Sequence, residues 1–335
     1  RFRRNYSASM VDLDNDGDLD LLTVNDFSGV DLFTNDGHGV FTDVTARAVD
    51  ERSLFGMGHA FGDFNNDSKL DFFVTGMSST TARRLEALGL GRKDFPELDA
   101  LRTKMAYGNR MYLGNGKGQY GEPDFKDQVA RSGWSWGVTA FDFGNDGNSD
   151  LYVANGNISR QSCKDYCTRF WRHDIYVDPM LPASALKELN RLEIDNYRQG
   201  SWNGFEKNHF FLNQGGAGFE NVAFLFDIAH EGDGRNVLSE DFDRDGRVDL
   251  LFVEMKRDRP QPRLLLHVLR NTWTSNGNWV GVDVKAGSGQ SGKGALVRVT
   301  AGGRQQISVV VNGDSYWCQH SQTRHFGLGA VSQVD

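Results

Sequence analysis

Cysteine, proline and long apolar runs are scarce in this chain of 335 residues. It has only 3 cysteines and 6 prolines. Three cysteines are too few for a disulfide-stapled scaffold, and no run of about 18 apolar residues marks a membrane span. The chain opens Arg1-Phe2-Arg3-Arg4, without methionine or an apolar signal core. We therefore expect any secretion signal to lie outside it, either removed or upstream of a sequence that begins within a longer protein.

An excess of positive charge is also missing. Lysine and arginine number 37 against 45 aspartates and glutamates, giving a net charge of -8. A general nucleic-acid binder needs a basic stripe, so we expect no nucleic-acid partner. The sequence lacks phosphate-loop and His-Glu-x-x-His motifs. Glycine is abundant, with 39 residues, which indicates many tight turns.

Four acidic segments repeat along the chain, each with aspartates near its first, third, fifth and ninth positions. They are residues 12–20, 63–71, 142–150 and 241–249. Each segment runs directly into a short apolar stretch, which is typical of a buried strand. A second motif follows the first three segments: an apolar stretch, a glycine turn at Gly37, Gly116 or Gly215, and an aromatic four residues later. This pattern predicts a β-hairpin.

The spacing of these motifs defines a repeat unit with two insertions. From each turn glycine to the start of the next acidic segment is 26 residues. From the start of each acidic segment to the turn glycine that follows it is 25, 53 and 73 residues. The extra residues fall between the second and third strands of the unit, near 78–106 and 157–205. Equivalent loops of a repeat fold emerge on one face, so we expect both insertions to project from the same side and to form a partner surface. Residues 81–105 and 183–199 look helical, and the fourth repeat, which lacks the glycine turn, looks terminal.

The acidic segments suit Ca²⁺. Carboxylates at alternate positions of a tight loop can point at one centre, the seventh residue can add a backbone carbonyl, and the ninth aspartate can close a shell of 6–8 oxygens. Zinc or copper would want histidine or cysteine, which these loops lack, and an EF-hand would need Glu at position 12 and flanking helices. We expect three or four Ca²⁺ ions. The predicted metal-binding residues are Asp12, Asp14, Asp16, Asp18, Asp20, Asp63, Asn65, Asp67, Lys69, Asp71, Asp142, Asp146, Asn148, Asp150, Asp241, Asp243, Asp245, Arg247 and Asp249.

The charge balance supports a cation in these loops. They hold 15 of the 45 acidic residues, and clustered carboxylates repel one another unless a cation neutralises them. Metal-free Asp/Asn/Gly turns are the alternative. Asn65 replaces one aspartate in the second loop, and Gly144 removes a side-chain ligand from the third, which we expect to be the weakest site. The ions would tie down loops and stabilise the fold rather than catalyse a reaction.

The repeats resemble the FG-GAP (VCBS-type) calcium-binding repeats of integrin α-chain propellers. The tail, through residues 278–282, 292–299, 313–316 and 325–329, is similar to an ASPIC/UnbV domain. Together they resemble the cartilage acidic protein family and its bacterial relatives. The resemblance implies an all-β fold: an FG-GAP-type β-propeller over residues 1–270, with at least four repeats and helical insertions, and a small ASPIC/UnbV-like β domain over 271–335. Integrin propellers have seven blades, but only four repeats precede this tail.

The resemblance also implies calcium binding, an extracellular, cell-surface or periplasmic location, and a role in adhesion or assembly. The first functional hypothesis is a secreted or surface module that binds a protein or glycan through the insertions. The second is an extracellular enzyme or redox protein that uses the insertion containing Cys163, Cys167, Trp171, His173 and Asp174. The third is a structural subunit that docks neighbouring subunits of a larger assembly.

Several single residues have both a structural and a functional interpretation. A local Cys163–Cys167 disulfide is favoured in an extracellular protein, while a metal or redox site and unpaired thiols stay open; Cys318 would then be unpaired or pair across domains. His59 is expected to pack near the propeller axis, with a channel-lining role as the alternative. The two histidines of the tail, His320 and His325, are expected to be structural. Trp134 and Trp136 are expected to pack between blades, with a sugar platform as the alternative.

Overall fold

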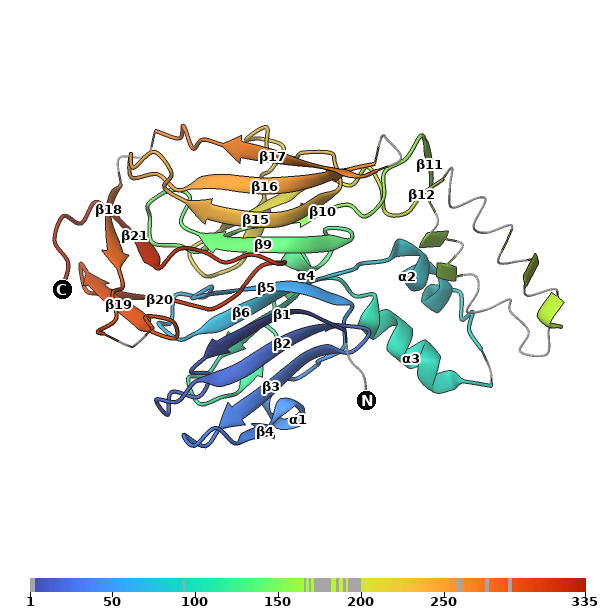
Figure 1. The fold of residues 1–335 in the computed structure, drawn as a ribbon, viewed down its shortest axis with the longest axis horizontal. Helices are drawn as coiled ribbons and strands as arrows, with labels where there is room; N and C mark the ends of the chain where they lie inside the picture. The colour runs from blue at the N-terminus through green and yellow to red at the C-terminus, as the bar shows by residue number, and fades with distance from the viewer. Residues whose placement is uncertain are drawn as a thin grey trace.

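A computed structural model describes residues 4–92, 94–165, 167–168, 170–171, 182–184, 187–188, 191, 200–257, 261–274, 277–288 and 291–335. Three four-stranded antiparallel sheets and one three-stranded sheet make up its main body (Figure 1). In each sheet the strands lie side by side in the order in which they occur in the chain. The all-β prediction is therefore confirmed.

The sheets have the following strands. The first contains β1 (Arg4–Val11), β2 (Asp20–Asp26), β3 (Gly29–Asn35) and β4 (Phe41–Asp43). The second contains β5 (Gly56–Gly62), β6 (Asp71–Gly76), β7 (Arg110–Gly114) and β8 (Tyr120–Gly121). The third contains β9 (Ser135–Phe141), β10 (Asp150–Asn155), β13 (His209–Asn213) and β14 (Phe219–Asn221). The fourth contains β15 (Gly234–Glu240), β16 (Asp249–Lys256) and β17 (Arg263–Leu269).

The apolar run after each acidic segment forms the second strand of its sheet, as predicted. The predicted glycine hairpins are also present, as β3–β4, β7–β8 and β13–β14. Turn glycines such as Gly37 and Gly116 have positive φ, a conformation that residues with a side chain rarely adopt. The fourth sheet ends at β17 without this hairpin, so the expectation of a terminal unit is confirmed.

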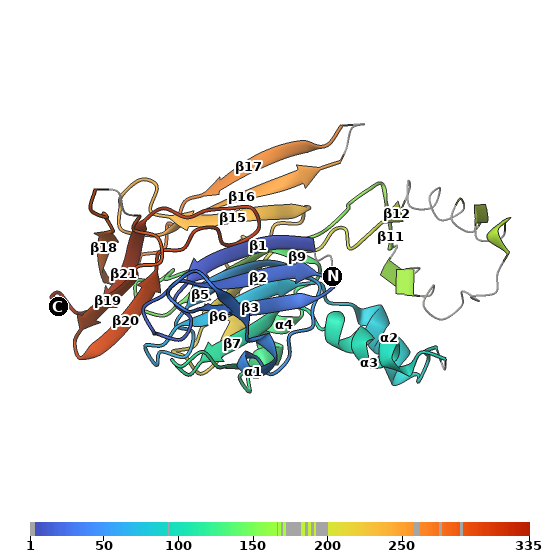
Figure 2. The same ribbon diagram turned by 60° about the horizontal axis from the view of Figure 1, so that its bottom comes forward.

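The core consists of apolar layers between neighbouring sheets. One layer joins the first and second sheets through residues such as Leu22 and Phe72. A second joins the second and third sheets, and a third joins the third and fourth through Tyr152 and Phe252. Beyond the fourth sheet, Leu264 and Leu266 on β17 are exposed. The described sheets therefore form an open arc of propeller-like blades and no closed ring (Figure 2).

The tail contributes two small hairpins and a segment that crosses the arc. β18 (Asn278–Asp283) pairs with β21 (Thr323–Gly329), and β19 (Leu296–Ala301) pairs with β20 (Arg304–Val309). Residues 313–320 lie between β20 and β21 in the chain and run along the first strands of all four sheets. The tail is therefore in contact with the repeats. The predicted boundary at residue 270/271 stays a prediction.

The crossing segment makes a polar contact with each sheet. The carbonyl of Ser315 accepts bonds from Ser7 Oγ of the first sheet and from the backbone N–H of His59 in the second. Its hydroxyl accepts from the backbone N–H of Val138 in the third. Asn236 Nδ2 of the fourth donates to the carbonyl of Tyr316. The tail therefore supplies a hydrogen-bond partner to the first strand of each of the four sheets.

The two insertions lie at the same end of the molecule, as predicted (Figure 1). The first forms α2 (Thr80–Ala87) and α3 (Pro96–Met105), and the second contains β11 (Ser162–Asp165) and β12 (Gly200–Ser201). They also touch: Thr81 Oγ1 lies 3.3 Å from Thr168 Oγ1, and apolar residues of both share one cluster. The predicted helix over 183–199 falls mostly outside the described residues.

Two short helices complete the described chain, α1 (Thr45–Ala48) and α4 (Lys126–Ala130). None of the described helices is long and apolar enough to cross a membrane.

Candidate calcium-binding loops

The four acidic loops share one hydrogen-bond scheme. In the first, Asp12 at position one accepts the backbone N–H groups of Asp16 and Gly17 at 3.2 and 3.1 Å. Asp16 at position five accepts the N–H of Asp18 at 2.9 Å. The same bonds recur in the other three loops through Asp63 and Asp67, Asp142 and Asp146, and Asp241 and Asp245. The aspartates therefore build the turn itself, as the Asx-turn alternative requires.

The ninth aspartate links the loop to two strands. Asp20 accepts the N–H of Leu13 at 2.8 Å and the N–H of Asn35, at the end of β3, at 2.9 Å. Asp71, Asp150 and Asp249 make the equivalent pair of bonds. All four are buried. The position thus fixes the start of the second strand against the end of the third.

Burial makes these carboxylates hard to ionise. Desolvation raises the pKa of Asp20 to about 6 and the pKa of Asp71 to about 8, although two N–H groups oppose the rise in each case. Burial also raises the pKa of Asp150 well above its ordinary value. Burial and then the nearby Asp146 raise the pKa of Asp142 to about 7. A divalent cation among these groups would remove that cost, because it favours the charged form.

The first loop has the donor set that fits Ca²⁺ best. Carboxylate oxygens of Asp12, Asp14 and Asp20 lie within 4.8 Å of one another. Asp14 Oδ1 is buried and makes no hydrogen bond within the described residues. Burial, followed by repulsion from Asp16, raises the pKa of Asp14. An unsatisfied buried oxygen beside two further carboxylates is suited to a hard cation.

The fourth loop brings together Asp241, Asp243 and Asp249 in the same way, but it already holds cationic side chains. Arg270 Nε lies 2.7 Å from Asp243 Oδ2, and its Nη2 lies 3.0 Å from Asp245 Oδ2. Arg247 also pairs with Asp245. Two arginines therefore neutralise part of the charge that a Ca²⁺ ion would otherwise neutralise.

The second and third loops do not bring three carboxylates within that distance, among the described residues. Asn65 takes the third position of the second loop and accepts the N–H of Asp67 at 3.3 Å. Lys69 Nζ lies 2.9 Å from Asp67 Oδ2, so its side chain acts as a counter-ion. In the third loop, Gly144 contributes no side chain. The expected order of the sites stays a prediction.

Some predicted ligands lie outside the two carboxylate clusters. Asp16, Asp18 and Asp245 belong to the two loops concerned, yet neither cluster includes them. Asn148 at position seven of the third loop accepts a bond from Asn66 Nδ2 instead. The side chains of Lys69 and Arg247 pair with neighbouring aspartates, which leaves only their backbone carbonyls as possible ligands.

The tail docks directly on these loops. Gly327 packs so closely on the third loop that a Cβ at this position would lie 2.0 Å from Asp142 Oδ2. His325 Nε2 lies 2.6 Å from Asn145 Oδ1. Arg304 on β20 donates to the carbonyls of Asp146 and Gly147 and to Asn66 Oδ1. The tail therefore depends on the shape of the second and third loops.

Comparison with known proteins agrees with this arrangement. Residues 12–74, which include the first two acidic loops, match the family model described as an FG-GAP-like repeat. Residues 285–335 match the model described as ASPIC and UnbV. The chain therefore has a match to an FG-GAP-like repeat near its start and a match to ASPIC and UnbV at its end. The resemblance inferred from the motifs is thus confirmed.

Two curated relatives share most of the length of this chain. Cartilage acidic protein 1 of Homo sapiens is 24% identical over 300 residues, covering 89% of this chain and 35% of the relative. Cartilage acidic protein 1 of Mus musculus is 26% identical over 302 residues, covering 89% and 36% respectively. This chain therefore spans about a third of the length of these relatives.

The cysteines do not form the local disulfide that the sequence favours. Cys163 is exposed and Cys167 is buried, and no disulfide joins them. Cys167 Sγ lies 3.4 Å from Ser79 Oγ of the first insertion. Burial raises the pKa of Cys318 to about 11, which makes it a poor nucleophile. His173 and Asp174 lie outside the described residues.

The burial and hydrogen bonds of His59, His320 and Trp136 agree with a structural role for these side chains. His59 is fully buried on β5, with Nε2 2.7 Å from Ser9 Oγ. His320 bridges Asp314 and Thr139 at 2.8 and 2.9 Å. Trp136 is buried and donates to the carbonyl of Gly156 at 2.9 Å; its ring stacks on Trp134 with centroids 6.1 Å apart.

Sequence reasoning missed the basic partners of the loops and a second cluster of metal-ligating side chains. Arg270 and Arg304 lie far in sequence from the aspartates they contact, so no local motif reveals them. His230, Glu254 and His267 form the other cluster. A signal for two of them is present: Glu254 and His267 interrupt the apolar runs of residues 250–255 and 264–269, and polar residues inside buried strands need partners.

Proposed function

We propose that this protein is a calcium-stabilised extracellular module that binds a protein or glycan partner through its paired insertions. The observation that carries the proposal is the placement of the two features. The acidic loops join the first and second strands of each sheet, and the insertions follow the second strand. Since consecutive strands are antiparallel, loops and insertions lie at opposite ends. One end can thus hold ions while the other meets a partner.

The first insertion has the surface that a partner would need. Leu88 is 69% exposed, and Phe95, Leu98 and Leu101 at the start and along α3 are 38–42% exposed. Arg92 lies over the Phe95 ring at 4.6 Å. Exposed apolar side chains next to charged groups are typical of interaction sites rather than of inert surfaces. The similarity to cartilage acidic protein 1 and the FG-GAP-like repeat support an extracellular interaction role.

The experiment is a binding screen of the calcium-loaded chain against arrays of extracellular proteins and glycans. Leu98→Lys combined with Leu101→Lys should abolish the strongest signals. Leu264→Lys combined with Leu266→Lys is the matched control, because these side chains on β17 are also exposed, at 67% and 62%. Melting curves check that both variants fold. Binding that survives the α3 change but is lost with the β17 change would place the partner surface on the fourth sheet instead.

A further inference from the structure

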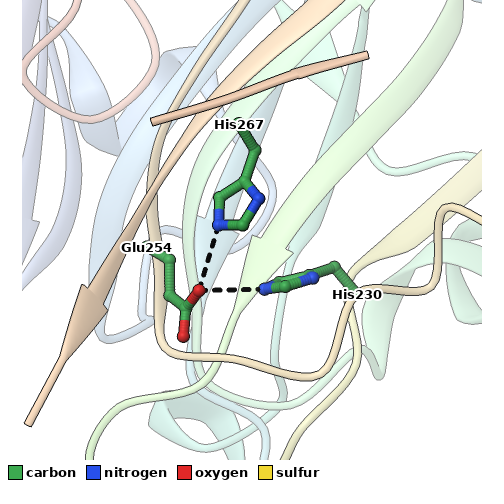
Figure 3. Close-up of side chains that lie close together, drawn as sticks. All are labelled: His230, Glu254 and His267. Carbon is green, nitrogen blue, oxygen red and sulfur yellow. Dashed lines mark hydrogen bonds and ion pairs between the residues drawn. The ribbon is translucent and has the colours of Figure 1, made fainter. Parts of the chain in front are cut away.

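Three side chains from separate parts of the chain meet on the fourth sheet: His230, Glu254 and His267 (Figure 3). Glu254 Oε2 lies 3.2 Å from His230 Nε2 and 3.0 Å from His267 Nε2. The two imidazole centroids are 4.5 Å apart. Both ε nitrogens therefore face a single carboxylate oxygen.

The fold holds each of the three groups in place. Glu254 on β16 and His267 on β17 are diagonal neighbours on one sheet face, because Phe252 pairs with His267 and Glu254 pairs with Leu265. The His267 ring stacks on the buried Phe252 ring, with centroids 4.5 Å apart and planes 7° apart. His230 precedes β15, and its carbonyl accepts the N–H of Asn208 at 2.9 Å. The cluster is thus ordered before any ligand arrives.

The donor set selects a type of ion. Two imidazoles and one carboxylate form a common Zn²⁺ set that leaves a fourth position open. Ca²⁺ prefers oxygen ligands only, so this cluster differs in chemistry from the acidic loops. A tetrahedral ion with bonds of about 2.0–2.1 Å separates its ligand atoms by about 3.3 Å. The nitrogen–oxygen separations of 3.0 and 3.2 Å are close to that value.

A glycine packs against the cluster, and a cavity lies beside Glu254. A Cβ on Gly232 would lie 2.7 Å from His230 Nε2 and 2.9 Å from Glu254 Oε1, so any side chain there would press into the cluster. Glu254 also lines a cavity of about 570 Å³ together with Ser159, Gly232 and Arg257. Among the described residues, the ion pairs of Glu254 are with the two histidines. No lysine or arginine of the described chain occupies the place of a cation.

We propose that His230, Glu254 and His267 bind one first-row transition metal ion, with Zn²⁺ as the ion that fits best. Glu254 supplies the charge, the two ε nitrogens supply the neutral ligands, and a fourth position stays open for water or a partner group. The cavity beside Glu254 gives that position access to solvent. This site does not depend on the calcium proposal, because it shares no residue with the acidic loops.

The test uses the full chain, stripped with EDTA, then saturated with Ca²⁺ and titrated with Zn²⁺ under reducing conditions by isothermal calorimetry. We expect one Zn²⁺ per chain with the wild type. His267→Gln and Glu254→Gln should each weaken Zn²⁺ binding by at least about tenfold. Co²⁺ in place of Zn²⁺ should give the visible absorption of a tetrahedral site, which the variants should lose.

Two control variants separate this site from other zinc ligands. His209→Gln changes a histidine on β13 outside the cluster, and Cys163→Ser removes an exposed thiol; both should bind Zn²⁺ as the wild type does. Melting curves show that each variant folds. Absence of Zn²⁺ binding by the folded wild type, or equal binding by folded His267→Gln, would overturn the proposal.

Discussion

The aspartates of the acidic loops are of two kinds, which differ in whether their oxygens accept hydrogen bonds from the protein. Asp20 and its counterparts accept two backbone N–H groups and so connect a loop to two strands, yet they are buried and costly to ionise. Asp14 has the opposite balance, since one of its oxygens is buried without a hydrogen bond in the described chain. A residue of the first kind stabilises the turn with or without metal, whereas we expect one of the second kind to bind a cation.

Asp14→Ala should therefore remove one Ca²⁺ ion from the chain. Its melting temperature in Ca²⁺ should fall, because ligand-derived stabilisation is lost. In EGTA the variant should be at least as stable as the wild type, since a half-buried carboxylate that Asp16 repels has gone. Calcium counting and melting curves check both points. Asp18→Ala, outside the carboxylate cluster, is the control; an equal loss of Ca²⁺ in that variant would contradict the assignment.

His59 should make stability depend on pH. Burial lowers the pKa of His59 to about 4, against about 6.5 in an unfolded chain. Between these values the unfolded chain binds a proton that the folded chain does not, so stability falls as the pH falls from 6.5 towards 4. His59→Gln cannot titrate but keeps a polar group near Ser9.

Urea unfolding of both proteins at pH 7 and pH 5 measures this effect. The unfolding free energy of the wild type should fall by about 2 kcal/mol more than that of His59→Gln, at about 1.4 kcal/mol per pKa unit. The variant controls for every other group that titrates in this range, including His209 and His325, whose pKa values burial also lowers to about 4. Equal losses in the two proteins would show that the pKa of His59 is not lowered on folding, so that His59 keeps its proton in the folded chain at pH 5.

At the scale of elements, the repeat unit could be predicted closely because its signals are local. Each acidic loop is followed directly by an apolar run, and each glycine turn is followed closely by an aromatic residue. These two local patterns predicted the order of the strands and the positions of the insertions. Contacts between distant elements could not be predicted. Arg270 reaches the fourth loop from the end of β17, and Gly327 reaches the third loop from β21, and nothing in the spacing of the aspartates indicates either.

Arg270 should compete with Ca²⁺ in the fourth loop. Its side chain is 60% exposed, so it can leave the loop without unfolding the sheet. Arg270→Gln should raise the calcium affinity of that loop by a few-fold. The positively charged guanidinium that pairs with Asp243 and Asp245 in the wild type would no longer compete with Ca²⁺ for these carboxylates. Calcium titration of a chain that also carries Asp14→Ala isolates this loop from the first one. Weaker binding in Arg270→Gln would mean that the arginine supports the site instead.

At the scale of the whole molecule, the tail holds an open arc together. Sheets one to four share three apolar layers, and residues 313–320 add a polar connection along their inner edges. Asp314 is central to that connection: it is buried and lies 2.8 Å from His320 Nδ1. Burial would raise the pKa of Asp314, but His320 and other basic groups outweigh it and lower the pKa. The carboxylate is thus charged at neutral pH.

Asp314→Asn should destabilise the whole molecule rather than the tail alone. Weakening a buried bond to a charged group costs about 1–3 kcal/mol, and both repeats and tail should unfold in one transition at a lower temperature. Asp283→Asn is the control, because this tail residue is 54% exposed and pairs only with Lys285 in the described chain. A separate early transition of the tail, with the repeats unchanged, would contradict the account.

Calcium counting on the purified native chain, followed by thermal melting with and without EGTA, tests the central claim most directly. The structure supports Ca²⁺ in the first loop most strongly, and the four repeats together predict three or four ions per chain. We expect that number, with a large fall in melting temperature when EGTA removes the ions. A chain that holds no Ca²⁺ and melts at the same temperature in EGTA would show that the aspartates are metal-free turns.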